Sequence, residues 1–299
     1  MDKDATNYWN SPEWKIPGTQ WEITGYSRAC YRTGFYIKSL DLMIDAGPQR
    51  SPSPKTILIT HCHGDHIASI PFTLIGKNEE QGLPNIFVPE KVQKHLNDYI
   101  LSMFSANYGQ TVNYELVKWW PVKDNKSESF RNYRAGSSRS INITIDTFPC
   151  YHDVPTVCYG ISSISKILKK EYEYLKGNNK ELGLLVKSGN IITEEITEPK
   201  IIFIWDTTIE IFTEKRILNY PIIMIECTFL YADDLEQSKK KKHIHWLDLR
   251  PFVINNPDIL FVLVHFSLRY KIQEIIDFFN KEKITKNINN VKPWVYLSD

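Results

Sequence analysis

Short apolar runs separated by polar connections dominate the chain and predict its strands. Residues 34–46 alternate between apolar and polar positions on either side of Lys38 and Ser39, a pattern typical of a hairpin. Unbroken apolar runs of four or five residues predict strands that are covered on both faces. These runs occupy residues 56–59, 201–205, 222–225 and 260–264. Two further strands are expected at residues 86–89 and 141–148.

Helical periodicity follows several of these strands. It predicts helices at residues 67–75, 90–104 and 270–281, the last of them amphipathic. Residues 164–187 are rich in Lys and Glu and show helical spacing in places. The polar stretch up to Gly18 is expected to be a loop or an arm. Because no internal repeat or obvious linker interrupts the alternation, we expect one α/β domain over residues 1–299.

The overall charge is nearly balanced, with 36 Lys and Arg against 35 Asp and Glu. Any affinity for a polyanion must therefore be local. The five cysteines are odd in number and irregularly spaced, which favours a reducing compartment over a disulfide framework. The charged start, Met1–Asp4, lacks the apolar segment of a signal peptide, and no run approaches the roughly 18 apolar residues of a membrane helix. We expect a cytoplasmic or otherwise intracellular protein with no membrane partner.

The densest chemistry lies two residues beyond the first unbroken strand, in the segment His61-Cys62-His63-Gly64-Asp65-His66. Three of the eight histidines fall in these six residues. On an extended segment the side chains of His61 and His63 point the same way, while Cys62 points away. Asp65 and His66 are then able to face a second position. This arrangement suits two metal ions, and imidazole with carboxylate favours Zn²⁺ while permitting Mn²⁺ or Fe.

One segment cannot supply enough ligands for two ions, so others must come from elsewhere. His152, Asp206 and His265 each stand at or just past the end of a predicted strand, where functional residues of layered α/β folds collect. Singly, each has a simpler interpretation, since a lone His is often structural and Asp206 before two threonines is a candidate helix N-cap. Their joint occurrence favours a metal centre.

The order of these residues resembles the metallo-β-lactamase superfamily, and the neighbouring residues resemble its ribonuclease Z branch, the tRNA 3′-processing endonucleases. The resemblance covers roughly residues 25–280 and implies a four-layer αββα sandwich. The segments that carry it are Thr60–Ile67, His152–Pro155 with Tyr159 and Gly160, Glu226–Phe229, and His265–Tyr270.

The resemblance also implies a role for each site residue. One ion would be held by His61, His63 and His152. The other would be held by Asp65, His66 and His265, and Asp206 would bridge the two. Asp65 would orient the attacking water, while Glu226 and His243 would form an acid/base pair that protonates the leaving 3′-oxygen. His245 competes with His243 for that role, although His243 has the better spacing.

This sequence departs from the family pattern at several positions. Trp205 and Ile225 stand where the family has Gly and His, and the His-Ser-Thr loop is His243-Ile244-His245. The stretch between His152 and Asp206 lacks a recognisable Gly/Pro-rich arm, the element that grips the tRNA elbow in the family. We therefore expect no such arm, and the substrate stays open between tRNA precursors and other RNA.

Several residues near the site are candidates for substrate contacts. Arg269 is placed to hold a phosphate, although a surface ion pair is equally compatible with its position. The run Lys239–Lys242, with Lys241 and Lys242 nearest His243, either tracks an RNA backbone or forms a solvated face. Tyr108, Trp119 and Trp120 are candidate stacking platforms, but core packing explains them better.

The leading hypothesis is a metal-dependent endoribonuclease of the ribonuclease Z type, in which two divalent ions activate a shared water for attack on a phosphodiester. The family resemblance suggests a homodimer. A β-lactamase or thioester hydrolase on the same two ions is the alternative enzyme, because one fold hosts many reactions. A non-catalytic binding module is the alternative from another class, although the complete ligand set argues against it.

Overall fold

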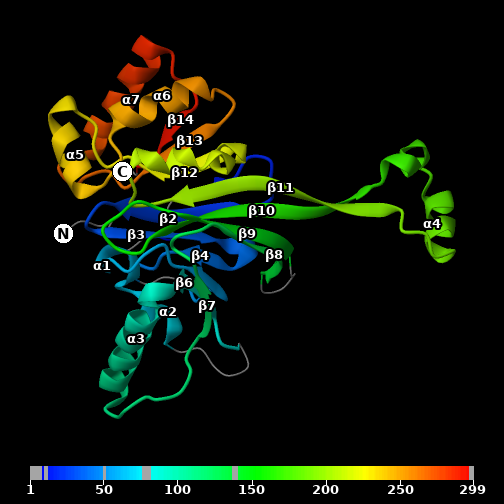
Figure 1. The fold of residues 1–299 in the computed structure, drawn as a ribbon, viewed down its shortest axis with the longest axis horizontal. Helices are drawn as coiled ribbons and strands as arrows, with labels where there is room; N and C mark the ends of the chain where they lie inside the picture. Colours follow the sequence, from blue (N-terminus) through cyan, green and yellow to red (C-terminus); the bar gives the residue numbers. More distant parts are fainter. Residues whose placement is uncertain (1–8, 10–12, 50–51, 76–81, 137–140, 296–299) are drawn as a thin grey trace.

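A computed structural model describes residues 9, 13–49, 52–75, 82–136 and 141–295 of the chain. Two seven-stranded sheets pack face to face, with helices on both outer sides (Figure 1). The first sheet holds β1 (Trp14–Lys15), β2 (Glu22–Arg28), β3 (Arg32–Ile37), β4 (Leu42–Ile44), β5 (Thr56–Leu58), β6 (Asn85–Pro89) and β7 (Lys118–Val122), in that order. The second holds β8 (Glu128–Ala135), β9 (Ile141–Pro149), β10 (Val157–Leu168), β11 (Thr193–Ile204), β12 (Ile222–Glu226), β13 (Leu260–Val264) and β14 (Val291–Pro293), again side by side in order.

Each sheet changes from antiparallel to parallel pairing halfway across. In the first sheet β1 to β4 pair antiparallel and β4 to β7 pair parallel. In the second sheet β8 to β11 pair antiparallel and β11 to β14 pair parallel. Because parallel strands finish at the same edge of a sheet, residues that follow β11, β12 and β13 gather together. The same holds for residues that follow β4 and β5.

Three apolar layers separate the four layers of secondary structure. Alternate residues of the parallel strands divide between them: Met224 of β12 lies between the sheets, whereas its neighbours Ile223 and Ile225 lie under the outer helices. The second sheet is covered by α6 (Trp246–Asn255) and α7 (Ile272–Lys286). The first is covered by α2 (Ile70–Leu74) and α3 (Gln93–Tyr108). The predicted αββα sandwich is confirmed.

The predicted elements match the structure with shifted boundaries. The hairpin at 34–46 consists of β3, the turn η2 (Lys38–Leu40) and β4, and every predicted strand is present. The helix predicted at 67–75 is instead two short pieces, α1 (Gly64–Ile67) and α2, because the backbone leaves the helical path around Ser69. The helix predicted from residue 90 begins with η4 (Glu90–Val92). Part of the expected N-terminal loop, residues 1–8 and 10–12, lies outside the described residues.

Trp119 and Trp120 pack against the core, as expected, and do not form an exposed platform for stacking on bases. The ring of Trp120 stacks on Phe87 with centroids 5.1 Å apart, and Trp119 packs against the core beneath α3. Tyr108 is 49% exposed but lies edge-on to Phe104.

In the described part of the chain, no helix has both the length and the apolar character needed to cross a membrane.

The expectation that the chain lacks an arm is wrong. Strands β10 and β11 continue beyond the sheet as a two-stranded ribbon that stays paired as far as Leu168 and Thr193. A register shift at Ile161 and Ser162 lies just before the ribbon leaves the body, since β9 pairs with β10 as far as Ser163. Its tip carries η5 (Lys170–Leu175) and α4 (Asn179–Lys187). A search for Gly and Pro cannot find this arm, because its ribbon is built from paired Ser, Ile, Lys, Thr and Glu residues.

Truncation of Phe203 should show that the layer between the sheets holds the fold together. Phe203 is fully buried there, beside Trp205. We expect Phe203→Ala to lower the free energy of unfolding by about 3–5 kcal/mol, the range for deleting a buried aromatic ring. Chemical denaturation measures it. The control Phe72→Ala removes a ring that is 53% exposed and should change stability by less than about 0.5 kcal/mol. Equal effects of the two substitutions would contradict the assignment of this core.

Candidate metal centre

The two sheets each contribute half of a cluster of metal-binding side chains. His61 and His63 lie on the loop that follows β5, and Asp65 and His66 belong to α1 directly behind it. The second sheet supplies the other half from residues that follow β9, β11 and β13, namely His152, Asp206 and His265. All seven residues that the sequence predicts as ligands are therefore brought together at one edge of the sandwich.

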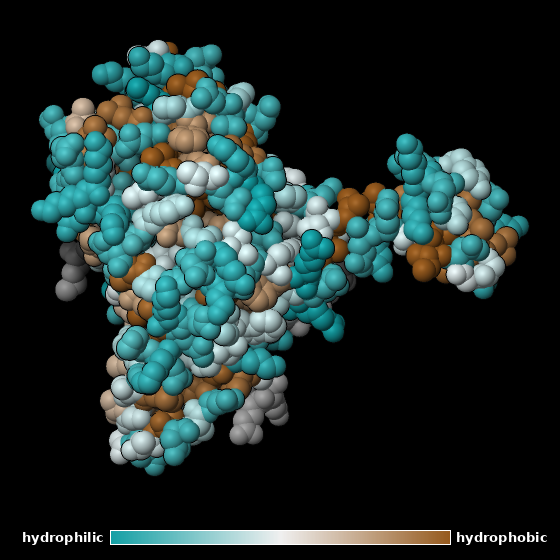
Figure 2. Space-filling view, viewed as in Figure 1, coloured by the Kyte–Doolittle hydropathy of each residue, from teal (hydrophilic) through white to brown (hydrophobic). Residues whose placement is uncertain are grey.

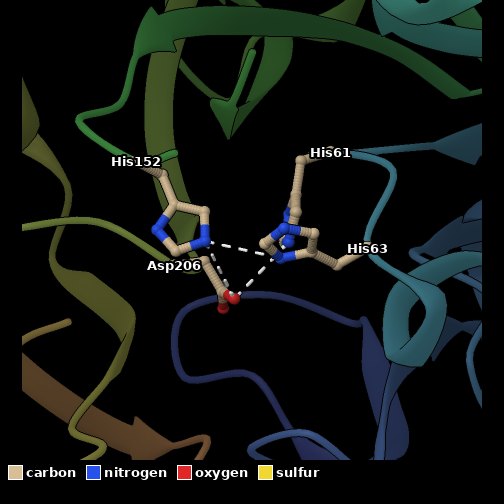
Figure 3. Close-up of side chains that lie close together, drawn as sticks. All are labelled: His61, His63, His152 and Asp206. Carbon is tan, nitrogen blue, oxygen red and sulfur yellow. Dashed lines mark hydrogen bonds and ion pairs between the residues drawn. The ribbon is translucent and has the colours of Figure 1, made fainter. Parts of the chain in front are cut away.

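The first group consists of His61, His63, His152 and Asp206, whose ligand atoms all lie within 4.8 Å of one another (Figure 3). Nε2 of His61 lies 3.4 Å from Oδ2 of Asp206, and Nε2 of His152 lies 3.8 Å from the same oxygen. Nε2 of His152 is also 3.4 Å from Nδ1 of His63. Three imidazoles and a carboxylate thus surround one small volume.

The second group consists of Asp65, His66 and His265. Oδ2 of Asp65 lies 3.6 Å from Nε2 of His66 and 3.7 Å from Nε2 of His265. Both imidazoles face the remaining oxygen of Asp206, Oδ1, at 3.6 Å and 3.3 Å. One oxygen of Asp206 therefore faces each group, which is the arrangement of a carboxylate that bridges two ions.

Hydrogen bonds behind the cluster decide which imidazole nitrogen faces inward. Nδ1 of His66 bonds to Asp45 at 2.7 Å. Thr60 donates its hydroxyl proton to the same carboxylate, so its oxygen accepts from Nδ1 of His61 at 3.0 Å. When the ring is neutral, Nε2 therefore carries no proton and points into the cluster, the form that binds a metal ion.

A second threonine links a carboxylate to a histidine Nδ1 on the other side of the centre, and we call this arrangement a threonine relay. Thr228 donates to Glu226 at 2.6 Å and accepts from Nδ1 of His265 at 3.2 Å. Nδ1 of His152 bonds to the backbone carbonyl of Lys242 at 3.3 Å. Four ligand imidazoles are thus oriented by an acceptor on their outer nitrogen.

The inner atoms of the cluster fit a divalent cation. Nε2 of His61, His66 and His265, and Oδ1 of Asp206, are buried and have no hydrogen-bond partner among the described residues. A buried polar atom without a partner costs roughly 1–3 kcal/mol, so four in one place call for a ligand. Imidazole nitrogen and carboxylate oxygen are the donors that Zn²⁺ and its neighbours accept.

Burial and the two carboxylates set opposite pKa shifts in neighbouring histidines. Burial lowers the pKa of His61 to about 3. Burial also disfavours charge on His66, but Asp206 and Asp45 outweigh it and raise the pKa of His66 to about 9. Although burial opposes it, His265 and His66 hold the pKa of Asp65 below its ordinary range. The carboxylate of Asp65 is therefore ionised at neutral pH.

Backbone geometry at the strand ends turns these side chains inward. Asp45, Asp206 and His265 each follow a strand and adopt positive φ values of 56°, 39° and 59°. Non-glycine residues rarely adopt this conformation, and such outliers concentrate at functional sites. Gly47 has a related role, because a Cβ there would lie 1.8 Å from the carbonyl oxygen of Asp65. The close contact of this loop with α1 requires glycine.

A buried carboxylate and a histidine form a second unit beside the metal ligands. Both oxygens of Glu226 lie 3.0–3.1 Å from Nδ1 of His243. Although burial opposes it, Glu226 raises the pKa of His243 to about 9. His245 lies elsewhere: it caps α6 by accepting from Leu247 N, and its other nitrogen bonds to a carbonyl. The structure thus brings His243, and not His245, to Glu226.

These observations can be compared with known proteins. No family model matches the chain. The chloroplastic tRNase Z TRZ2 of Arabidopsis thaliana is 30% identical over 264 residues, which cover 85% of this chain and 69% of that protein. The tRNase Z TRZ1 of the same plant is 27% identical over 264 residues, covering 85% of this chain and 88% of that protein. The chain belongs to the ribonuclease Z family. The predicted enzyme class, a hydrolytic endoribonuclease, is confirmed.

Solved structures support the fold independently. The metallo-β-lactamase fold protein YhfI of Bacillus subtilis superimposes with a TM-score of 0.51 at 13% identity, covering 90% of this chain and 92% of that chain. At this identity the likeness establishes the shared fold alone.

The departures of this ribonuclease Z from the family pattern have structural explanations. Trp205, in place of Gly, is fully buried between the sheets and stacks on Phe35 with centroids 5.4 Å apart. Ile225, in place of His, packs in the layer beneath α6 and α7. His245 caps a helix. None of these replacements removes a ligand atom from the metal centre.

The predicted substrate contacts lie at the rim of the centre. The guanidinium of Arg269 donates to Gln237 at 2.9 Å and pairs with Asp234, so the structure ties it to α5 (Leu235–Lys241). Lys242 pairs with Asp153 at 2.7 Å, whereas Lys241 is exposed. Contact of these side chains with substrate stays a prediction.

Three functional residues escape the sequence prediction: Asp45, Thr60 and Thr228. Asp45 follows β4 as Asp206 follows β11, so the rule of a polar residue after a strand would have found it. The two threonines flank predicted site residues, but no pattern distinguishes a relay hydroxyl from any other buried threonine.

Chelation should destabilise the protein, because it leaves the inner nitrogens and oxygens without partners. A ligand present at 100 times its dissociation constant stabilises a protein by about 2.7 kcal/mol, and its removal reverses that gain. We expect EDTA to lower the melting temperature and added Zn²⁺ to restore it. The Asp206→Ala variant should lose the response, and His95→Ala, at an exposed histidine of α3, should retain it. An unchanged melting temperature in EDTA would rule out a metal centre that stabilises the fold.

Proposed function

We propose that this ribonuclease Z cleaves tRNA precursors with two divalent ions, of which Zn²⁺ suits the ligands best. The observation that carries the proposal is Asp206, whose two oxygens face two separate groups of ligands. Ions held there would lower the pKa of a shared water and offset charge on the phosphate. The residue roles below follow the assignments that the family resemblance implies.

Asp65 is placed to orient the attacking water. Its side chain is 14% exposed, whereas His66 and Asp206 beside it are nearly inaccessible, so it lies on the open side of the second group. Its depressed pKa keeps it ionised, so it can accept a hydrogen bond from that water and orient it.

His243 is placed to protonate the leaving 3′-oxygen. Its side chain is 12% exposed, and its ring lies 5.2 Å from that of His152 and 5.5 Å from that of His265. Nδ1 faces Glu226, so Nε2 is left to act on the substrate. Thr207 N and Ile244 N also donate to Glu226, which keeps this buried carboxylate oriented toward His243.

The arm supports tRNA, rather than small esters, as the substrate. It stands well away from the body and exposes both lysines and apolar side chains at its tip (Figure 2). Tyr174, 78% exposed, offers a ring for stacking on a base. Lys169, Lys170 and Lys176 lie near it and can each contact a phosphate, in a segment that also carries Glu171 and Glu173. A β-lactam or thioester would not reach this element.

The proposal also covers the compartment, the domain organisation and the oligomeric state of the protein. Five free cysteines suit a reducing, intracellular compartment. One domain over the whole chain is supported by the apolar layer that both sheets share. A homodimer is proposed from the family resemblance alone, and analytical ultracentrifugation of the purified protein would measure it.

Three substrates separate the candidate functions. Protein loaded with Zn²⁺ or Mn²⁺ should cleave a 3′-extended tRNA precursor and bis(p-nitrophenyl) phosphate but not nitrocefin. Asp65→Ala should reduce both phosphodiester reactions to background, and the control Asp98→Ala, an exposed acid on α3, should not. Hydrolysis of nitrocefin alone would refute the nuclease assignment. Two bound ions without turnover of any substrate would favour a binding module.

Replacing the arm should weaken tRNA binding without disturbing the chemistry. We expect exchange of residues 164–197 for a two-residue Asn-Gly turn to leave the body folded, because β9 pairs with β10 no further than Ser163. KM for the tRNA precursor should rise about tenfold or more, a loss of about 1.4 kcal/mol in binding free energy. Turnover of bis(p-nitrophenyl) phosphate should be unchanged. An unaltered KM for the precursor would exclude the arm from substrate binding.

A further inference from the structure

The two halves of the metal centre belong to different sheets, so something must fix one sheet against the other at the site. Beside the first group of ligands, two hydrogen bonds do this. The backbone N–H of Val157 donates to the carbonyl of Thr60 at 3.0 Å, and the hydroxyl of Tyr159 donates to the carbonyl of Ile59 at 2.9 Å. They join β10 directly to the loop that carries His61.

Beside the second group, the corresponding connection is made by a residue outside every motif, Arg28. It is the last residue of β2 in the first sheet, and it forms an isolated parallel bridge with Phe266, the residue after His265. The next residue along, Ala29, donates its backbone N–H to the carbonyl of Phe266 at 3.2 Å. Through this turn the first sheet contacts the loop that carries His265.

The side chain of Arg28 reinforces that contact with three hydrogen bonds. Its guanidinium donates to the carbonyls of Phe266 at 3.0 Å, Ser267 at 2.8 Å and Tyr270 at 2.7 Å. It is 8% exposed, and no carboxylate of the described residues pairs with it. Burying an unpaired cation is costly unless polar groups surround it, so the turn 266–270 is shaped to receive this guanidinium.

The turn 266–270, which Arg28 holds, directly follows His265 and orients it. Thr228 clamps it from the opposite side, because its backbone carbonyl accepts from Ser267 N and its hydroxyl contacts the carbonyl and the ring of His265. His265 itself has a φ of 59°, which this double clamp must maintain. The guanidinium contacts no ligand side chain in the described residues, so its influence on the centre passes through the backbone.

We propose that Arg28 is the positioning residue of the second metal group, fixing His265 of one sheet against Asp65 and His66 of the other. The inference rests on the two-ion centre of the proposed function but not on its substrate. Outer contacts of this kind typically alter metal affinity by 10- to 100-fold. Arg28→Met should therefore weaken one of two zinc ions and spare the other.

Zinc affinity measured by competition with a chelating dye, without RNA, tests this directly. The wild type should bind two ions, and Arg28→Met should bind one of them about 10- to 100-fold less tightly, with the affinity for the other unchanged. A double-mutant cycle locates the effect: adding Arg28→Met to His265→Ala should change zinc affinity no further, whereas adding it to His152→Ala should. Arg250→Met, which removes a half-buried arginine paired with Glu282, is the matched control and should bind both ions as the wild type does.

The outcomes separate a positioning role from a merely structural one. Two ions bound with wild-type affinity by Arg28→Met, even at a lower melting temperature, would overturn the proposal. If Arg28→Met does not fold, Arg28→Lys keeps the charge but cannot span three carbonyls, and it should still lose affinity for one ion. Wild-type affinity for both ions in Arg28→Lys would overturn the proposal equally. A wild type that holds fewer than two ions would refute the two-ion centre, and this inference with it.

Discussion

Seven ligand side chains from two separate sheets must converge on one small volume, and the rest of the structure depends on that convergence. Three imidazole nitrogens and one carboxylate oxygen are buried there without hydrogen-bond partners among the described residues. Burying such atoms without partners is costly, and divalent cations held between them would offset that cost. The strand ends, the left-handed residues and the threonine relays all serve to hold these atoms in place. Asp206 is the central element, because it alone faces both groups.

The cluster of candidate metal ligands could be predicted from the sequence because residues with metal-binding side chains stand directly after buried strands. Parallel strands appear as unbroken apolar runs, and the first polar residue after each one faces the same edge of the sheet. This rule locates Asp206 and His265, and the dense segment 61–66 locates His61. The choice of His243 over His245 follows from the family spacing, and the contact with Glu226 agrees with it.

Other features depend on three-dimensional pairing that no local pattern records. The arm escapes prediction because its strands are exposed on both faces and pair only with each other, so their residues show no burial pattern. Arg28 escapes because its partners are backbone carbonyls more than 200 residues away along the chain, at separations of 238–242. Trp205 looks like a departure from the family pattern, yet it fills the layer between the sheets.

The central claim, that two ions share Asp206 between ligands from both sheets, is tested most directly by anomalous scattering from crystals of the zinc-loaded protein. The account predicts two zinc peaks, both in contact with Asp206. One should also contact His61, His63 and His152, and the other Asp65, His66 and His265. A single peak, or two peaks that do not share Asp206, would contradict it.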